Sequence, residues 1–350
     1  MTSEAVLSAL PDIVKAVPGC RGRLAGSLGW TRWHTDGPLP SVCTLEPWDG
    51  QPGAAFLTRP LNVWTGPIVE VLCGDGRLVV RTHHAAMDGR GTLAFVDALC
   101  ACLRGESPPS ATAGAPTDLE LARALPVPAE SSPVEDCLAP TGECEGTESA
   151  TTWARRRFEG KVKRPVAAVA HSLAAAARKH GQGEVRVAVS VDMRRHDPSL
   201  QSTANLSGIV RLTPERTIAA TDRALRSLLA AHLEGAFVLS VAPVRWLPLW
   251  LLTWAGRRKV TGVQQTSRYG TTATISNLGR QLPERFNVPG FKAQRSFWIP
   301  AGQPGLPLFL TLTGDATGVE IVGSMPVGLA SRGRLDALMD AIVQGIGTPS

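Results

Sequence analysis

The 350-residue chain contains few aromatic side chains and no cysteine pair at a metal-binding spacing. Aromatic residues make up 5% of the sequence, with one tyrosine, and no helix-turn-helix, zinc-finger or RNP-like pattern is present. These absences argue against a nucleic-acid-binding protein, although the formal net charge is +6. The seven cysteines are odd in number and scattered, which argues against a disulfide framework and a zinc site. We therefore expect reduced thiols in a cytoplasmic, monomeric protein without a bound metal.

Long apolar runs are also scarce. The first 16 residues include acids and no apolar run, so we expect no signal peptide. The segment 237–254 is unusually apolar, but Arg245 and two prolines interrupt it, which disfavours a membrane span. Our first interpretation of this segment is a buried core helix. The alternatives are a wall of an acyl-chain tunnel and a patch that makes peripheral contact with a membrane surface.

Acidic residues are concentrated in residues 105–150. This segment has nine acids and a single arginine, Arg123, a local charge of −8 that leaves +14 on the rest of the chain. It is rich in proline, alanine and serine and shows little periodicity, as is typical of a flexible, solvated connection. We predict an N-terminal domain at 1–104, a flexible acidic linker at 105–150 with a short helix near 117–125, and a C-terminal domain at 151–350. Shortening the linker should hardly change the melting temperature.

Local patterns in the N-terminal domain predict a hairpin followed by a helix. Residues 68–73 and 78–84 are apolar runs separated by Gly74-Asp75-Gly76, which is a favourable turn sequence. Apolar residues then recur at helical spacing over 91–103. The two adjacent histidines, His83 and His84, therefore stand at the end of a predicted strand and just before a predicted helix.

The C-terminal domain is expected to alternate strands and helices. Its first segment is basic, and residues 152–179 are predicted to form a helix kinked at Pro165. Apolar and polar residues alternate along 185–191, as in a half-buried strand. One apolar face predicts a helix over 335–346. Further strands are predicted at 208–213, 271–276, 308–313 and 318–323. The whole pattern indicates a mixed α/β fold.

The two histidines are the clearest candidates for a chemical role. On a strand His83 and His84 point to opposite faces, so only one of them can occupy a given site. The positive end of the helix that follows can stabilise developing negative charge. Judged from these residues alone, a structural role for the histidines stays open beside a catalytic one. A metal site is disfavoured, because adjacent side chains diverge and no third ligand has a suitable spacing.

The run His83-His84-x-x-x-Asp88-Gly89 resembles the signature of the chloramphenicol acetyltransferase-like superfamily. This superfamily includes nonribosomal peptide condensation domains, plant-type and polyketide-associated acyltransferases, and wax ester synthases. Residues 64–67, 89–93, 189–195 with 205–208, and 274–280 resemble further motifs in the order of the family. The chain is short for the family, and Ser-Asn-Leu-Gly replaces the plant-type Asp-Phe-Gly-Trp-Gly motif. The resemblance is therefore nearest to polyketide-associated and wax-ester-synthase-like alcohol acyltransferases.

The resemblance implies two chloramphenicol acetyltransferase-like subdomains around a central tunnel. It implies that His84 is the general base, which takes a proton from an acceptor hydroxyl or amine as that group attacks a thioester. Asp88 would be ion-paired with Arg194, and Gly89 would keep the turn tight. Ser276 and Asn277 would bind substrate. The structural residues of the site would thus be His83, Asp88, Gly89 and Arg194.

The predicted function is acyl transfer in lipid or natural-product biosynthesis, without a bound cofactor. The co-substrate would be acyl-CoA or acyl-phosphopantetheine on an acyl or peptidyl carrier protein, and the acceptor an alcohol or amine. Two alternatives stay open: a non-catalytic condensation-like recruiting module, and cyclisation, dehydration or epimerisation of a carrier-bound intermediate. One basic cluster is either a solvated helix face or a docking face for a carrier protein or for the phosphates of coenzyme A. Its members are Arg155, Arg156, Arg157, Lys161, Lys163 and Arg164.

Overall fold

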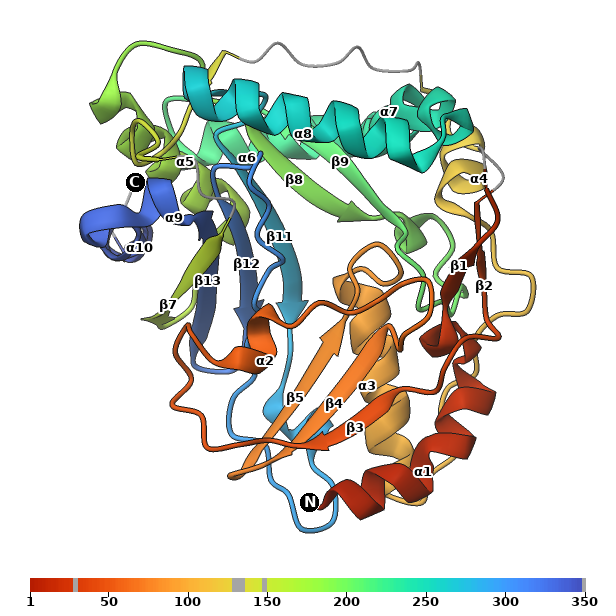
Figure 1. The fold of residues 1–350 in the computed structure, drawn as a ribbon. Helices are drawn as coiled ribbons and strands as arrows, with labels where there is room; N and C mark the ends of the chain where they lie inside the picture. The colour runs from red at the N-terminus through yellow and green to blue at the C-terminus, as the bar shows by residue number, and fades with distance from the viewer. Residues whose placement is uncertain (28–30, 128–135, 147–149, 348–350) are drawn as a thin grey trace. The chain divides into compact units, whose positions relative to one another are not determined.

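The computed structural model describes residues 1–27, 31–127, 136–146 and 150–347 (Figure 1). The chain divides into two compact units. Unit 1 comprises Met1–Leu121, Asp192–Ser207 and Leu282–Arg295, and unit 2 comprises Ala122–Val191, Gly208–Gln281 and Ser296–Ser350. The units are interleaved along the chain, whereas the sequence predicts consecutive domains. The difference arises because two later segments bind to the N-terminal one, as the ion pair between Arg285 and Asp97 illustrates.

Unit 1 is built on a three-stranded sheet of order β3-β4-β5. β3 (Ser41–Thr44) runs parallel to β4 (Val69–Gly74), and β4 pairs antiparallel with β5 (Arg77–Thr82). A separate antiparallel ribbon consists of β1 (Arg23–Ala25) and β2 (Arg32–His34). The helices of the unit are α1 (Ser3–Ala16), α2 (Ala55–Thr58) and α3 (Gly89–Leu103).

The hairpin and the helix predicted for the N-terminal region are present in unit 1. Asp75 and Gly76 form the turn between β4 and β5 with φ angles of 48° and 65°. A two-residue hairpin turn favours such left-handed values, which glycine adopts without strain. α3 packs against α1, which buries Val6 and Ile13. This core supports the junction between β5 and α3, where the histidines lie.

Unit 2 is built on a six-stranded sheet of order β7-β13-β12-β11-β8-β9. β11 runs parallel to β8 and β12, whereas β13 is antiparallel to β12 and β7. The strand bounds are β7 (Thr151–Glu159), β8 (Val187–Asp192), β9 (Ser207–Leu212), β11 (Ala273–Arg280), β12 (Phe309–Gly314) and β13 (Gly318–Pro326). Strands were predicted at five of these places, and β7 is the exception.

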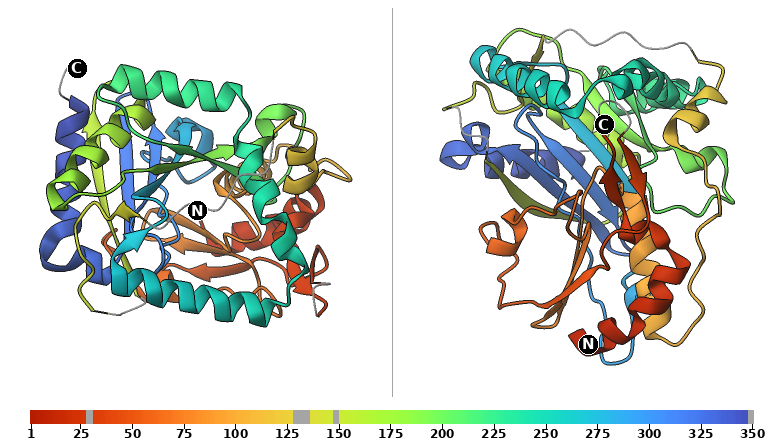
Figure 2. Two further views of the ribbon diagram at one scale, coloured as in Figure 1. Left: turned by 90° about the horizontal axis from the view of Figure 1, so that it is seen from above. Right: turned by 45° about the vertical axis from the view of Figure 1, so that its right-hand side comes forward.

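Helices α5 (Pro165–Ala177) and α10 (Arg334–Gly347) pack together on one face of this sheet (Figures 1 and 2). α10 buries Leu335, Leu338, Met339 and Ile342, which confirms the predicted C-terminal helix. The other helices of unit 2 are α6 (Ile218–Ala230), α7 (Glu234–Val241), α8 (Leu249–Thr266) and α9 (Val327–Ala330). The predicted mixed α/β class is confirmed.

The helix predicted over 152–179 is wrong in its first half. Thr151–Glu159 forms β7 and pairs with β13 along its whole length. Arginines at 155–157 occupy both faces of this strand, so the sequence lacks the alternation of apolar and polar residues that indicates a strand. The helix begins only at Pro165. Proline is tolerated in the first turn of a helix, because the N–H group that it lacks would have no intrahelical hydrogen-bond partner there.

Parts of the predicted flexible linker make specific contacts with distant residues. The backbone N–H groups of Ala111 and Thr112 donate to the carbonyls of Ala16 and Gln201 at 2.7 and 2.8 Å. The short helix is present as α4 (Asp118–Arg123). The segment is therefore tethered at Ala111 and Thr112, although most residues from 105 to 114 are exposed. The composition of the segment does not reveal these contacts, because the groups that pair with its backbone lie far along the chain.

The later part of the predicted linker also contributes to a core. β6 (Cys137–Leu138) pairs with β10 (Arg268–Tyr269) in unit 2, and both residues of β6 are buried. A segment with few apolar residues can therefore be ordered by burying those few against a preformed sheet or helix. Residues 128–135 and 147–149 of this predicted linker lie outside the described part of the chain.

The apolar segment 237–254 does not form a buried core helix. It is divided among the end of α7, the 3-10 helix Ala242–Trp246 and the start of α8, and prolines lie at both breaks. Its three tryptophans are exposed, which contradicts the first interpretation. Within the described residues, no single helix has the length and apolar character needed to cross a membrane. α6 together with the Glu234–Trp246 stretch, bent by 57°, meets that length and composition as a pair.

Candidate active site

The candidate site is the turn that connects β5 to α3 in unit 1, residues 83–88, which we call the histidine turn. β5 ends at Thr82, and α3 begins at Gly89. The His83 N–H still donates to the Ile68 carbonyl at 2.9 Å, and the His83 carbonyl accepts from the Ala86 N–H at 2.9 Å. Both histidines therefore follow the strand instead of ending it. The predicted divergence of their side chains stays a prediction.

The two histidines differ in their surroundings. His83 is half-buried, and its Nδ1 accepts from the Ala85 N–H at 3.3 Å. Burial lowers the pKa of His83, and the neighbouring His84 lowers it further, so the His83 imidazole is held neutral. His84 is exposed, and its backbone carbonyl accepts from the Asn205 side-chain amide at 3.0 Å. The imidazole of His84 is therefore the more solvent-exposed of the two.

Asp88 anchors the end of the histidine turn. It is 2% exposed, and its Oδ1 accepts from the Gly91 N–H at 2.6 Å, which makes it the N-cap of α3. Its Oδ2 accepts from Arg194 Nη1 at 3.0 Å, from the Leu206 N–H at 2.8 Å and from Ser207 Oγ at 3.2 Å. One buried carboxylate thus joins the histidine turn, the start of α3 and the returning segment Asp192–Ser207.

Arg194 organises the returning segment around Asp88. Its Nη1 also reaches Asp192 Oδ1 at 2.8 Å, its Nε donates to the Ser202 carbonyl at 3.1 Å, and its Nη2 donates to the Ala204 carbonyl at 2.6 Å. Burial opposes the charge on Arg194, but the Asp88 and Asp192 carboxylates outweigh it and raise the pKa of Arg194. The pairing of Asp88 with Arg194 is the one that the sequence predicts.

Gly91 is a site residue whose importance the sequence does not reveal. A Cβ at this position would lie 2.1 Å from the Thr203 carbonyl oxygen, so only glycine lets the returning segment lie against the start of α3. Gly89 is the first residue of α3. The hydroxyls of Thr82 and Thr92 lie 2.7 Å apart and link the end of β5 to the same helix. Asn205 and Gly91 both fall within recognised motifs, but their contacts depend on residues far along the chain.

Ser276 and Asn277 belong to β11 of unit 2. Ser276 pairs in register with residues of β8 and β12, so it lies in the interior of the sheet. Asn277 is exposed, and its Oδ1 accepts from the Gly279 N–H at 3.0 Å, at an irregularity where β11 leaves its register with β12. The residues of unit 1 that were predicted for the site are held together by direct contacts, whereas these two are features of the other unit.

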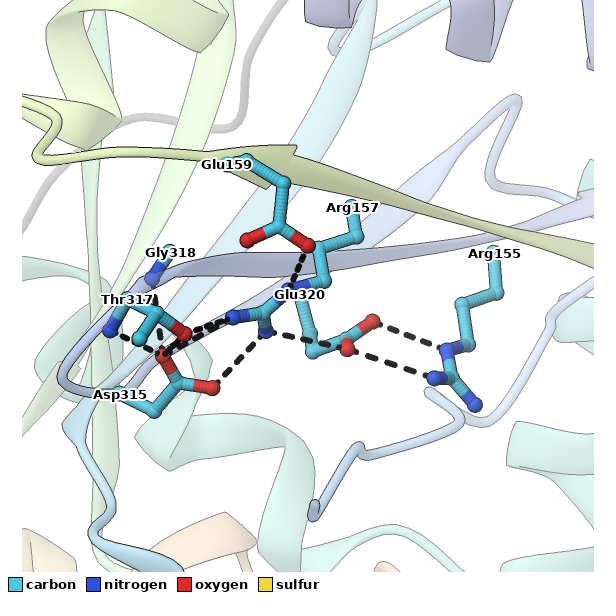
Figure 3. Close-up of polar contacts among 7 residues, drawn as sticks. All are labelled: Arg155, Arg157, Glu159, Asp315, Thr317, Gly318 and Glu320. Atoms are coloured by element: carbon cyan, nitrogen blue, oxygen red, sulfur yellow. Dashed lines mark hydrogen bonds and ion pairs between the residues drawn. The ribbon is translucent and has the colours of Figure 1, made fainter. Parts of the chain in front are cut away.

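The basic cluster proposed as a docking face is largely neutralised within unit 2. Figure 3 shows Arg155 and Arg157 of β7 with the acids around them. Arg155 Nε lies 2.9 Å from Glu320 Oε2, and Arg157 Nη1 lies 2.8 Å from Asp315 Oδ2 and 3.2 Å from Glu320 Oε1. Arg157 holds the pKa of Asp315 well below its usual range. Glu320 is 2% exposed, so this is a structural ion network.

The remaining cations of that cluster divide between paired and exposed residues. On the other face of β7, Arg156 pairs with Asp336 and Asp340 of α10 at 2.8 and 2.5 Å. Arg164 lies 3.3 Å from Asp222. Lys161 and Lys163 are exposed. Positive charge therefore no longer supports a docking surface at residues 155–157, because acids of the same unit already compensate these arginines.

No family model matches the chain, and no curated protein sequence matches it. Solved structures do match. The first condensation domain of the CDA synthetase has a TM-score of 0.63 at 15% identity, over 99% of this chain and 87% of that chain. The condensation domain from Monacolin K polyketide synthase MokA has a TM-score of 0.61 at 11% identity, over 99% and 88%. The epimerization domain from the third module of tyrocidine synthetase B has a TM-score of 0.55 at 12% identity, over 99% and 88%. The chain has the fold of the condensation domains, as its motifs predict.

Proposed function

We propose that this protein is a condensation-type acyltransferase of natural-product biosynthesis with His84 as its general base. The acyl group would move from a coenzyme A or carrier-protein thioester to a hydroxyl or amine acceptor. The observation that carries the proposal is the exposed His84 on a turn whose end is fixed by the buried carboxylate of Asp88. A base on so constrained a turn is held ready for an incoming acceptor.

The reaction needs a group that first accepts a proton and later returns it, and an imidazole can do both. Neutral His84 takes the acceptor proton while the acceptor oxygen or nitrogen attacks the thioester carbonyl. The carbon–sulfur bond then breaks, and the imidazolium returns the proton to the departing thiolate. The N-terminus of α3 follows within the same turn, and its positive end favours developing negative charge.

The proposed co-substrate is acyl-CoA or acyl-phosphopantetheine, and no bound cofactor enters the chemistry. A carrier protein is the proposed partner when the donor is carrier-bound. Lys161 and Lys163 are the members of the basic cluster that remain exposed and could attract its acidic surface. Ser276 and Asn277 are retained as proposed hydrogen-bonding residues for the substrate. The resemblance of their motif to that of alcohol-acylating relatives supports this role.

An acceptor-dependent thiol-release assay tests the proposal. The full chain is incubated with acyl-CoA and acyl-carrier thioesters and with a panel of alcohols and amines, and products are identified by mass. We expect thiol release that depends on one acceptor class and is lost in His84→Ala. His180→Ala, an exposed histidine of unit 2, is the matched control and should keep wild-type activity. Acceptor-independent release, or release that His84→Ala leaves unchanged, contradicts the proposal.

Epimerisation is the second candidate, because an epimerization domain shares the fold. In that reaction the same base would remove the α-proton of a carrier-bound aminoacyl group instead of an acceptor proton. Incubation of aminoacyl-carrier thioesters in deuterated water without acceptor distinguishes the two. Deuterium at the α-carbon supports epimerisation, and an unlabelled thioester supports acyl transfer. Tight carrier binding with neither reaction would support the recruiting module.

A further inference from the structure

Large apolar side chains are exposed in unit 2 where a 3-10 helix leads into α8. The exposed fractions are 61% for Trp246, 67% for Trp250 and 52% for Trp254. Tryptophan is usually well buried, and soluble monomers rarely leave several large apolar residues together at the surface. We call this set the tryptophan face. Its other exposed members are Val241, Val244, Leu247 and Leu249.

The tryptophan face continues into a helix that is exposed along nearly its whole length. Of the 18 residues of α8, Val263 alone is buried. At about 3.6 residues per turn, Trp250, Trp254 and Arg257 project within about 60° of one another around the helix axis. The first half of α8 is therefore apolar and the turn after it is basic, on the same side. α8 is the long helix beside α7 in Figure 1.

The charged residues in the stretch of sequence that contains the tryptophan face have one sign. No acidic residue occurs from position 235 to 283. Two cations lie over the indole rings: Arg245 is 5.8 Å from the ring of Trp246, and Arg258 is 5.0 Å from the ring of Trp254. Such contacts hold the cations at the margin of the apolar surface. The cations of this stretch are Arg245, Arg257, Arg258, Lys259, Arg268 and Arg280.

We propose that the tryptophan face binds the surface of an anionic lipid bilayer. Tryptophan combines a large apolar body with one polar N–H, which suits the boundary between headgroups and acyl chains. Arginine and lysine at its edge can contact anionic headgroups while their methylene stems remain in the apolar layer. Anionic lipid headgroups supply the charge opposite to that of this acid-free stretch.

The same chemistry disfavours a second copy of the chain as the occupant. A symmetric dimer brings the same patch of both copies together, so two basic surfaces, each with Arg257 and Arg258, would enter one interface and repel. A bilayer has no such penalty. Docking on a bilayer requires neither an acyl donor nor His84, so this inference goes beyond the proposed function and can be tested without an activity assay.

Co-sedimentation of the full chain with unilamellar vesicles tests the inference. One vesicle preparation is phosphatidylcholine alone, and in the other about a third of the lipid is phosphatidylserine. We expect binding to the anionic vesicles that is about tenfold tighter than binding to the neutral ones. Trp250→Ala/Trp254→Ala and Arg257→Glu/Arg258→Glu should each weaken it about tenfold or more. The matched control Arg178→Glu/Lys179→Glu alters exposed cations elsewhere on unit 2 and should change binding less than about twofold.

The outcomes that overturn the inference are distinct. Equal loss of binding in the control variant would mean that general positive charge, and not the tryptophan face, attracts the vesicles. A dimer that dissociates in Trp250→Ala/Trp254→Ala, without vesicle binding, would assign the face to a second copy. Binding of an acidic carrier domain without vesicle binding would assign it to a protein. If the tryptophan variant does not fold, the arginine variant and quenching of wild-type tryptophan fluorescence by brominated lipid decide.

Discussion

Asp88 and Arg194 lie 106 positions apart in the chain, yet Arg194 Nη1 donates to Asp88 Oδ2 at 3.0 Å. The Asp88 side chain is buried and that of Arg194 is mostly covered, at 3% and 11% exposure, so the charge of Asp88 depends on Arg194 for compensation. The same carboxylate caps α3 through the Gly91 N–H. A single pair therefore holds the histidine turn, a helix start and a distant segment in one arrangement.

Loss of this pair should destabilise unit 1. Asp88→Ala leaves Arg194 buried with only Asp192 as a counter-ion and removes the cap, so we expect a loss of about 3–5 kcal/mol in the free energy of unfolding. Urea unfolding measures it. Asp36→Ala breaks an exposed pair with Arg23 and should change the free energy of unfolding far less. An Asp88→Ala protein that is fully stable but inactive would indicate a direct chemical role instead.

His84→Ala should reduce turnover by about 10²–10⁴-fold without changing the melting temperature, because the proposed base is exposed and contributes little packing. His83→Ala should reduce turnover less, but it should lower the melting temperature, because this imidazole is half-buried and accepts the Ala85 N–H. Steady-state kinetics and thermal unfolding of both variants check the contrast. Retention of more than half of the wild-type turnover in His84→Ala would refute the base assignment.

His83 should make the protein sensitive to mild acid. Burial lowers the pKa of His83 in the folded state, so below about pH 6.5 the unfolded chain binds a proton that the folded chain resists. Stability should therefore fall as the pH decreases from 7.5 to 5.5. His83→Gln removes this proton and should show a smaller fall over the same interval. Parallel pH profiles of the melting temperature for wild type and variant would contradict the prediction.

Arg157 should matter for stability and not for donor binding. Its side chain is 10% exposed and lies between Asp315 and Glu320, so Arg157→Met leaves acidic charge uncompensated in the sheet (Figure 3). We expect a loss of up to about 3–5 kcal/mol, measured by urea unfolding. Lys161→Glu/Lys163→Glu changes only exposed residues and should leave stability unaltered. A higher KM for the thioester in a fully stable Arg157→Met protein would restore the docking interpretation.

The segment 107–116 should be sensitive to shortening. Thr112 donates its N–H to the Gln201 carbonyl at 2.8 Å, and its hydroxyl accepts the Gln201 N–H at 2.9 Å. Thr112→Val removes the second bond and should cost about 0.5–1.5 kcal/mol. Deletion of the segment removes both bonds and that of Ala111, so it should cost more than Thr112→Val. An unchanged melting temperature after deletion would return this segment to the class of solvated linkers.

The sequence by itself determines the elements that rest on near neighbours in the chain. Each of these elements has its sequence pattern within itself. Examples are the Asp75-Gly76 turn, the alternation along β8 and the apolar face of α10. The pairing of Asp88 with Arg194 has no local signal, and it could be predicted only because the motifs resemble those of a known superfamily. Gly91 was inside such a motif, but its close approach to Thr203 is visible only in the folded chain.

Only the tertiary structure decided which charges and apolar residues are covered. The arginines of β7 are stable on a strand because acids from β13, its preceding turn and α10 reach them. Residues 111 and 112 are ordered because carbonyls from distant positions accept their N–H groups. The sequence determined that 237–254 is apolar, but no described element covers Trp250 and Trp254 of α8 fully. Local propensity decides which backbone conformation is accessible, whereas burial and pairing depend on partners that the fold brings from elsewhere in the chain.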